Sequence, residues 1–145
     1  MEEEKNGHWN NLPDDFNFDD WFGFVYCITR KDTQRKYIGK KQTSSYRRKK
    51  VKGRTNRKKV ISESNWKKYT GSCDELNQEI EELGKDKFTF EVLKLCKTKG
   101  ELTFSEVNYQ FKYDVLTSIL ENGEREYYNS NIMNRWFSSS SYLSS

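Results

Sequence analysis

The chain has 145 residues and a net charge of +4, with 33% hydrophobic, 15% aromatic and 33% charged residues. This length suits one compact domain, and the aromatic share favours a core built from rings rather than from many aliphatic side chains. The sequence contains neither an apolar run of about 18 residues nor a basic-then-apolar leader, which excludes a membrane-spanning or secreted protein and predicts a cytoplasmic one.

The positive charge is concentrated in one segment. Residues 1–20 hold seven acids and one lysine, a net of −6, whereas residues 30–68 hold seventeen Lys or Arg and two acids, a net of +15. Residues 69–145 hold eight basic and thirteen acidic residues, a net of −5. Such a segment attracts a polyanion, and nucleic acid is the commonest one, although a solvated surface run is the alternative.

The first predicted elements follow an acidic extension over residues 1–20, which is either a loosely docked tail or a strap over the basic segment. Residues 24–29 and 36–41 are rich in aromatic and β-branched residues and predict a β-hairpin. A short helix is expected to begin near Thr43, with Thr43 or Ser44 as its N-cap. Residues 47–59, with nine Lys or Arg among thirteen residues, have no apolar period and predict a flexible basic insertion.

The second half of the chain predicts helix, strand and helix. Leu76, Ile80 and Leu83 recur at helical spacing before Gly84, which indicates a helix over residues 74–83. Residues 88–94 alternate like a strand. A Thr-Lys-Gly-Glu capping box then opens a helix that is expected to run from residue 98 to about residue 120.

This order predicts an α/β fold of the α+β type. We expect a small mixed or antiparallel three-stranded sheet that starts with a β-hairpin and is flanked by helices. The expected organisation is an acidic extension over 1–20, a domain over 21–136 with the basic insertion, and a serine-rich tail over 137–145. Three separated cysteines without Cys-x-x-Cys spacing predict neither a zinc site nor a disulfide framework, and they fit a reducing compartment.

Two short motifs place tyrosines on neighbouring strands of the predicted hairpin. The triplets Phe24-Val25-Tyr26 and Tyr37-Ile38-Gly39 are separated by ten residues. Taken alone, Tyr26 and Tyr37 are better explained as core or cross-strand packing residues. Glu106 falls on the apolar face of the last helix, where an ionised acid requires a cation or hydrogen bonds, or else a structural ion pair.

These features together resemble the GIY-YIG nuclease family over roughly residues 22–130. The second triplet matches the family pattern fully, and the first reads Phe-Val-Tyr where Gly-Ile-Tyr is common. The resemblance implies an arginine on the first helix, for which Arg47 has the right spacing and Arg48 competes. It also implies a helical glutamate, Glu106, and an asparagine near the end of the domain, Asn129.

The resemblance implies a DNA endonuclease that depends on Mg²⁺ or Mn²⁺. Glu106 would hold the cation and Arg47 would steady the scissile phosphate, while the two hairpin tyrosines would orient and activate water. Supporting roles fall to Gly39 and Asn129. The predicted DNA-binding residues are the cations that surround the second triplet and the insertion, namely Lys40, Lys41, Arg48, Lys49, Lys50, Lys52, Arg54, Arg57, Lys58 and Lys59.

Some assignments stay open. Val51 stands where many family members have a histidine or tyrosine, so the general base is Tyr26, Tyr37 or Tyr69. Residues 66–72 resemble small GIY-YIG proteins of tailed bacteriophages, some of which are homing endonucleases, and a phage origin would place the protein in the host cytoplasm. The alternatives are a nucleic-acid-binding protein that has lost catalysis and a protein-interaction module, and a homodimer is compatible with all three.

Overall fold

The computed structural model describes the backbone of residues 5–50 and 57–138, and the side chains of residues 5–44 and 62–138. Among these residues, no helix is long and apolar enough to cross a membrane. The last seven residues of the serine-rich tail lie outside the described part of the chain.

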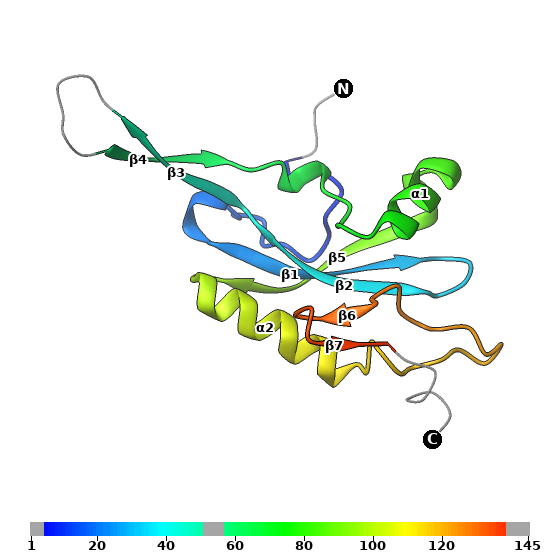
Figure 1. Ribbon diagram of the computed structural model, residues 1–145. Helices are drawn as coiled ribbons and strands as arrows, with labels where there is room; N and C mark the ends of the chain where they lie inside the picture. The colour runs from blue at the N-terminus through cyan, green and yellow to red at the C-terminus, as the bar shows by residue number, and fades with distance from the viewer. Residues whose placement is uncertain (1–4, 51–56, 139–145) are drawn as a thin grey trace.

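A three-stranded antiparallel sheet forms the centre of the molecule, as predicted (Figure 1). Its order is β2-β1-β5, with β1 spanning Gly23–Arg30, β2 spanning Lys36–Gln42 and β5 spanning Phe88–Cys96. The hairpin of β1 and β2 matches the predicted pair of strands. Alternate residues of β1 enter two separate hydrophobic clusters, so both faces of the sheet are covered.

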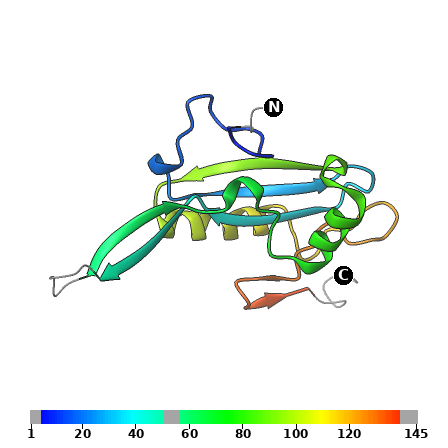
Figure 2. The same cartoon turned by 90° about the horizontal axis from the view of Figure 1, so that it is seen from above.

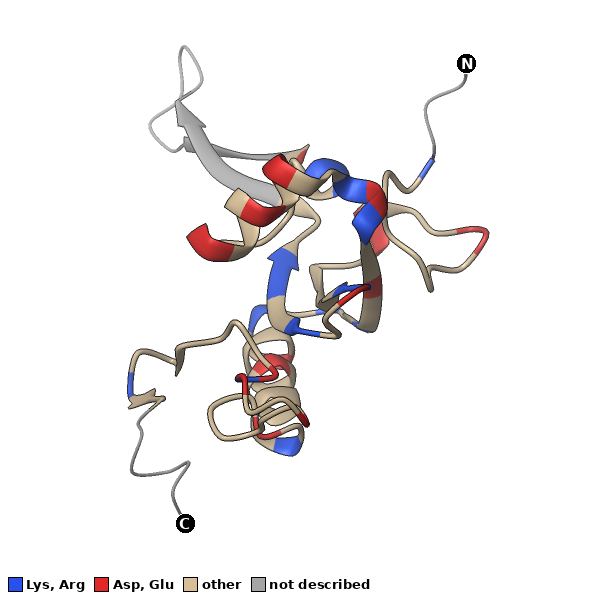
Figure 3. Ribbon diagram, turned by 90° about the vertical axis from the view of Figure 1, so that its right-hand side faces the viewer, with Lys and Arg blue, Asp and Glu red and all other residues tan. Residues whose placement is uncertain are grey.

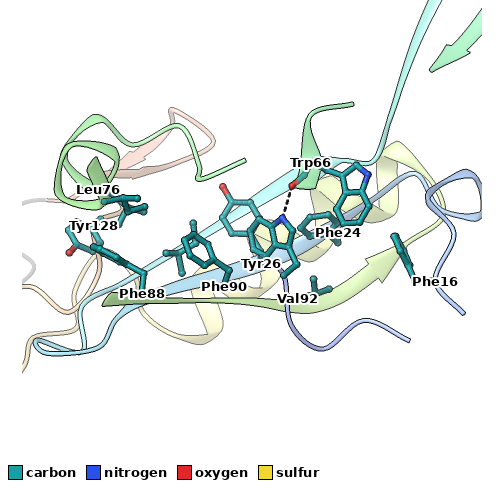
Figure 4. Close-up of a cluster of buried hydrophobic side chains, with 12 residues drawn as sticks. Phe16, Phe24, Tyr26, Trp66, Leu76, Phe88, Phe90, Val92 and Tyr128 are labelled. Atoms are coloured by element: carbon teal, nitrogen blue, oxygen red, sulfur yellow. Dashed lines mark hydrogen bonds between the residues drawn. The ribbon is translucent and has the colours of Figure 1, made fainter. Parts of the chain in front are cut away.

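Different elements cover the two faces of the sheet. Helix α2, Lys99–Lys112, lies against one face, and helix α1, Asp74–Leu83, lies toward the other face with the short helix η2, Trp66–Lys68 (Figures 1 and 2). Two further short helices are η1, Phe18–Asp20, and η3, Lys85–Lys87. Figure 4 shows the cluster on the η2 side, which consists mainly of aromatic rings, as the composition indicated.

The N-terminal segment packs into this aromatic cluster, which corrects the expectation of a loosely docked tail. Trp9 and Phe16 are 4% and 5% exposed, and the indole of Trp9 donates a 2.6 Å hydrogen bond to the carbonyl of Trp66. The ring of His8, in the same segment, stacks on Phe90 with 3.9 Å between centroids. Isolated aromatic residues in a polar segment give no periodic signal, so the sequence did not reveal this docking.

The helix expected from Thr43 does not form. Residues Ser44–Lys50 form strand β3, which pairs antiparallel with strand β4, Arg57–Glu63. The hydroxyl of Thr43 donates to the carbonyl of Trp21 at 2.8 Å instead of capping a helix. The basic insertion is therefore largely a two-stranded ribbon, and the predicted sites Lys52 and Arg54 lie outside the described residues.

The helices of the second half follow the prediction more closely. Helix α1 has the predicted bounds and ends at Gly84, whose φ of 94° is the conformation that glycine favours. The capping box at the start of α2 is present, since the backbone N–H of Glu101 donates to Thr98 Oγ1 at 3.1 Å. However, α2 ends at Lys112 rather than near residue 120, because the chain turns at Asp114 with a φ of 54°.

The chain ends in a small ribbon that the sequence did not predict. Strands β6, Asn131–Ile132, and β7, Trp136–Phe137, pair antiparallel beside α2 (Figure 1). Two residues a strand are too few to produce a visible alternation in the sequence.

Candidate active site

The two triplets meet across the β1–β2 hairpin. Tyr26 pairs with Gly39, and Ile28 pairs with Tyr37. A methyl group at Gly39 would stand 2.5 Å from the hydroxyl of Tyr26 and 3.0 Å from the ring of Tyr37. Gly71, at a φ of 89°, approaches the same two rings from the loop before α1. Glycine is thus required at Gly39 because both tyrosine rings lie over it.

A cavity of about 570 Å³ opens at the outer edge of β2. Tyr37 and Lys40 enter it from β2, Glu106 enters it from α2, and Ser72 enters it from the loop before α1. The hydroxyls of Tyr37 and Ser72 are 3.2 Å apart and hydrogen-bonded. The remaining lining residues come from both helices and the C-terminal segment: Cys73, Asp74, Thr103, Gln110, Tyr128, Asn129, Ser130, Asn131, Met133 and Asn134.

Glu106 is an acid of this cavity that lies between helix α2 and strand β2. Its side chain is 18% exposed, and its carboxylate lies 3.9 Å from the ammonium of Lys40. Burial raises the pKa of Glu106, and the charge and the backbone N–H of Lys40 oppose that rise. The prediction of an acid on the inner side of this helix is confirmed. The partner of Glu106 is the half-exposed Lys40, with which it forms a long ion pair.

The two tyrosines of the triplets differ in their access to the cavity. Tyr26 is 1% exposed, whereas Tyr37 is half-buried and lines the cavity. Burial raises the pKa of both phenols, and the charge of Glu106 adds to that rise in each case. The protein environment therefore shifts both pKa values upward, opposite to the direction expected for a general base.

Asn129 forms hydrogen bonds with the backbone of β2 at the outer edge of the sheet. Its side-chain oxygen accepts from the backbone N–H of Ile38 at 3.1 Å, and its amide donates to the carbonyl of Ile38 at 2.8 Å. Gln110 of α2 donates to the same carbonyl at 3.1 Å. The two side chains thus replace a neighbouring strand at the middle residue of the second triplet. Sequence reasoning missed Gln110, because the contact spans 72 positions along the chain.

Arg47 is not where the sequence placed it. The residue lies on strand β3 rather than on a helix, and its side chain is outside the described part of the structure. It follows Gly39 by eight residues along nearly extended chain, a path of about 26 Å at the rise of a strand. Among the described side chains, the cation that lies beside Glu106 is Lys40, which the sequence had placed only among the DNA contacts.

Residues 8–132 match the family described as "Putative endonuclease segE, GIY-YIG domain". The chain belongs to the GIY-YIG endonuclease family. The match covers most of the chain and confirms the resemblance that the two triplets carried, including the mixed α/β fold with its antiparallel sheet. No curated protein and no solved structure matches the chain.

The residues of the GIY-YIG site fit a hard cation that keeps most of its water. No group of three or more His, Cys, Asp or Glu side chains comes together among the described residues, so a fully protein-liganded site is not formed there. Mg²⁺ binds through one or two carboxylates and retains several waters. The Glu106 carboxylate, partly buried and facing a polar cavity, suits that mode of binding.

Proposed function

We propose that this GIY-YIG protein is a divalent-metal-dependent endonuclease that hydrolyses phosphodiester bonds of DNA. The observation that carries the proposal is the convergence of Glu106, Tyr37 and Lys40 on one cavity at the edge of β2. Together they supply a carboxylate that binds a cation, a hydroxyl that orients water and a positive charge that stabilises phosphate. Phosphodiester hydrolysis requires these three functions. The resemblance of residues 66–72 to phage proteins supports a homing role in the host cytoplasm.

In this proposal, Glu106 is the residue that holds Mg²⁺ or Mn²⁺. A divalent cation at this position supplies charge neutralisation at the phosphate and lowers the pKa of bound water. Both effects are needed because no histidine among the described residues lines the cavity to act as a general base. The one histidine of the chain, His8, is stacked on Phe90 in the aromatic cluster. Burial raises the pKa of Glu106 although Lys40 opposes that rise, so a bound cation would stabilise the ionised carboxylate further.

Tyr37 is the phenol that orients the attacking water. Its hydroxyl lines the cavity and is hydrogen-bonded to Ser72 Oγ at 3.2 Å, which holds the hydroxyl in place. Since burial raises the pKa of Tyr37, the phenol acts as a hydrogen-bond acceptor for water before it acts as a base. Tyr26 lies behind it, supports the ring of Tyr37 at 6.2 Å between centroids, and has no comparable access.

Lys40 takes the phosphate-steadying role that the sequence gave to Arg47. Its ammonium is 3.9 Å from Glu106 and also contacts Thr103 Oγ1 at 3.3 Å, so it is held at the cavity rather than free in solvent. A lysine at this position stabilises charge that develops on the phosphoryl oxygens. We expect Lys40→Gln to reduce cleavage roughly 10²-fold, whereas Lys41→Gln, the adjacent cation outside the cavity, reduces it much less.

A plasmid nicking assay tests the proposal. Supercoiled plasmids of several sequences are incubated with the protein in Mg²⁺, in Mn²⁺ and in EDTA. The proposal predicts nicked or linear product with either cation and none in EDTA, and the ratio of the two products reports whether one or both strands are cut. Absence of product with every plasmid and both cations would reject the nuclease and favour a DNA-binding protein that has lost catalysis.

A further inference from the structure

The β3–β4 ribbon projects from the body of the protein. Each strand has seven residues, and the pairing runs in register from Ser44 opposite Glu63 to Lys50 opposite Arg57. At the usual rise of a strand, the ribbon is about 23 Å long. Figures 1 and 2 show that it extends past the end of the central sheet without a helix over either side.

The register of the ribbon sets like charges against one another. Arg48 lies opposite Lys59, Lys49 opposite Lys58, and Lys50 opposite Arg57 (Figure 1 shows the paired strands). Directly opposed like charges destabilise an antiparallel pair. Since successive pairs of a ladder belong to alternate faces, the backbone register places basic residues on both faces of the ribbon. A polyanion beside such a ribbon would relieve this repulsion.

The base of the ribbon is fixed to the core. Thr43 is fully buried, its N–H donates to the carbonyl of Phe22 at 3.0 Å, and its carbonyl accepts from the N–H of Ser64 at 3.0 Å. The hydroxyl of Ser64 also donates to the carbonyl of Gln42 at 2.6 Å. The ribbon therefore continues directly from β2, and its base lies four residues from Gly39, or about 13 Å along an extended chain.

Basic residues connect the candidate active site with the base of the ribbon. A second cavity of about 260 Å³ shares Lys40 with the first and adds Lys41, Lys99 and Tyr69. The ammonium of Lys41 lies 4.3 Å from the centroid of the Tyr69 ring. At the other end of the sheet, α1 carries five acids and no basic residue, and Figure 3 shows these acids along the helix. The charge pattern favours a polyanion on the ribbon side of the cavity.

We propose that the β3–β4 ribbon lies in the major groove of duplex DNA. The DNA strand beside that groove then occupies the cavity at the edge of β2. The inference rests on the proposed nuclease function and specifies its substrate as a duplex. The major groove of B-form DNA is about 12 Å wide and admits a two-stranded ribbon, whereas the major groove of duplex RNA is too deep and narrow. A ribbon of this length spans about seven base pairs to one side of the cut.

Equilibrium binding without cleavage tests this inference. Fluorescence anisotropy in EDTA compares a DNA duplex, the same duplex with bulky groups on cytosine C5, and an RNA duplex of the same sequence. The ribbon variant is Lys49→Gln/Lys58→Gln, which removes one opposed pair. The matched control is Lys31→Gln/Lys87→Gln, two lysines at the opposite end of the sheet, where Arg30 pairs with Phe88. A thermal melt of each variant confirms folding.

The ribbon variant should bind the DNA duplex about 30-fold more weakly at 0.15 M salt, with a log–log salt slope shallower by up to about 1.8. The wild type should prefer the DNA duplex over the RNA duplex and over the C5-modified duplex, and the ribbon variant should lose much of that preference. The control variant should keep both the slope and the preference. We expect the ribbon variant to melt no lower than the wild type, because a like-charged pair is gone.

An unchanged salt slope in the ribbon variant would remove the ribbon from the DNA interface. Equal binding of all three duplexes by the wild type would show a phosphate contact without groove insertion and would also overturn the inference. The outcome is separate from that of the nicking assay, because binding is measured without metal. A protein that binds as described but never nicks would reject the proposed function, and a protein that nicks with an unchanged slope would reject the ribbon.

Discussion

The cavity at the edge of β2 and the β3–β4 ribbon are consecutive along the chain but are built in different ways. The cavity is enclosed by two helices and the C-terminal segment, and its β2 edge is held by side-chain hydrogen bonds from Asn129 and Gln110. The ribbon is fastened at its base by backbone hydrogen bonds of Thr43 and Ser64. Packing and hydrogen bonds position the first region, whereas in our proposal DNA stabilises the second.

This difference indicates that chemistry and affinity are separable in the molecule. A rigid site near the sheet can align water, phosphate and cation, which requires fixed positions. A protruding ribbon with cations on both faces can follow a groove without disturbing those positions. Substitutions in the two regions should therefore change different measured quantities.

Tyr37→Phe should produce a large loss in rate with little loss in affinity. The ring and its packing remain, but the hydroxyl that orients water is removed, which costs about 10²-fold in single-turnover cleavage. Tyr26→Phe and Tyr69→Phe, whose hydroxyls lie outside the first cavity, should lose less than about tenfold. If Tyr26→Phe is the slower enzyme, the roles of the two hairpin tyrosines are exchanged.

Asn129→Leu should destabilise the cavity region and leave the ribbon unaffected. The substitution leaves the buried N–H of Ile38 without its acceptor, which costs about 1–3 kcal/mol of the free energy of unfolding. Urea denaturation measures this loss. Asn108→Leu on the exposed side of α2 is the matched control and should change the free energy of unfolding by less than about 0.5 kcal/mol. Equal effects of the two substitutions would contradict the edge-holding role.

His8→Gln should make the stability less dependent on pH. Burial, followed by the nearby charge of Lys85, lowers the pKa of His8 to about 4 in the folded protein, whereas the unfolded chain has the ordinary value of about 6.5. Between these values the unfolded chain binds more protons, so stability falls as the pH falls through this window. The variant lacks this contribution, and Gln can still donate to the carbonyl of Tyr69.

The measurement is the difference in melting temperature between wild type and His8→Gln as a function of pH. The difference should grow in favour of the variant from pH 7 to pH 4, because carboxylate titration is common to both proteins and cancels. A constant difference across this range would show that His8 titrates alike in the folded and unfolded chains. Cleavage at pH 8 should be nearly unchanged, since His8 lies outside the cavity.

The ribbon variant Lys49→Gln/Lys58→Gln should show the smallest effect on chemistry. At protein concentrations that saturate the DNA, its single-turnover rate should stay within about threefold of the wild-type rate, although its affinity is lower. A much lower rate at saturation would mean that the ribbon positions the scissile phosphate and that the two regions are not separable.

The sequence predicted the strands and helices that are marked by local residue patterns. Aromatic and β-branched residues located β1 and β2, period-two alternation located β5, and apolar spacing with Gly84 located α1. Glu106 could be placed because its helix has a clear capping box and inner face. Lys40 and Gln110 could not be assigned in this way, because their roles depend on contacts between α2 and β2 that are distant along the chain.

The ribbon was missed because its local signals conflict. Thr43 and Ser44 resemble helix caps, and the run of cations that follows has no apolar period of either kind. What decides its structure is pairing between β3 and β4, together with the burial of Thr43 against Trp21. The docking of Trp9 was missed for a related reason, since only the aromatic cluster on the sheet gives this residue a place to be buried.

The most direct test of the account is cleavage by Glu106→Gln, measured beside Glu101→Gln, a matched change on the same helix whose side chain serves the capping box. The account predicts that Glu106→Gln folds, binds duplex DNA in EDTA with nearly wild-type affinity, and cleaves at least about 10³-fold more slowly at every Mg²⁺ concentration. Glu101→Gln should cleave normally. Mg²⁺-dependent cleavage by Glu106→Gln within about tenfold of the wild-type rate would contradict the account.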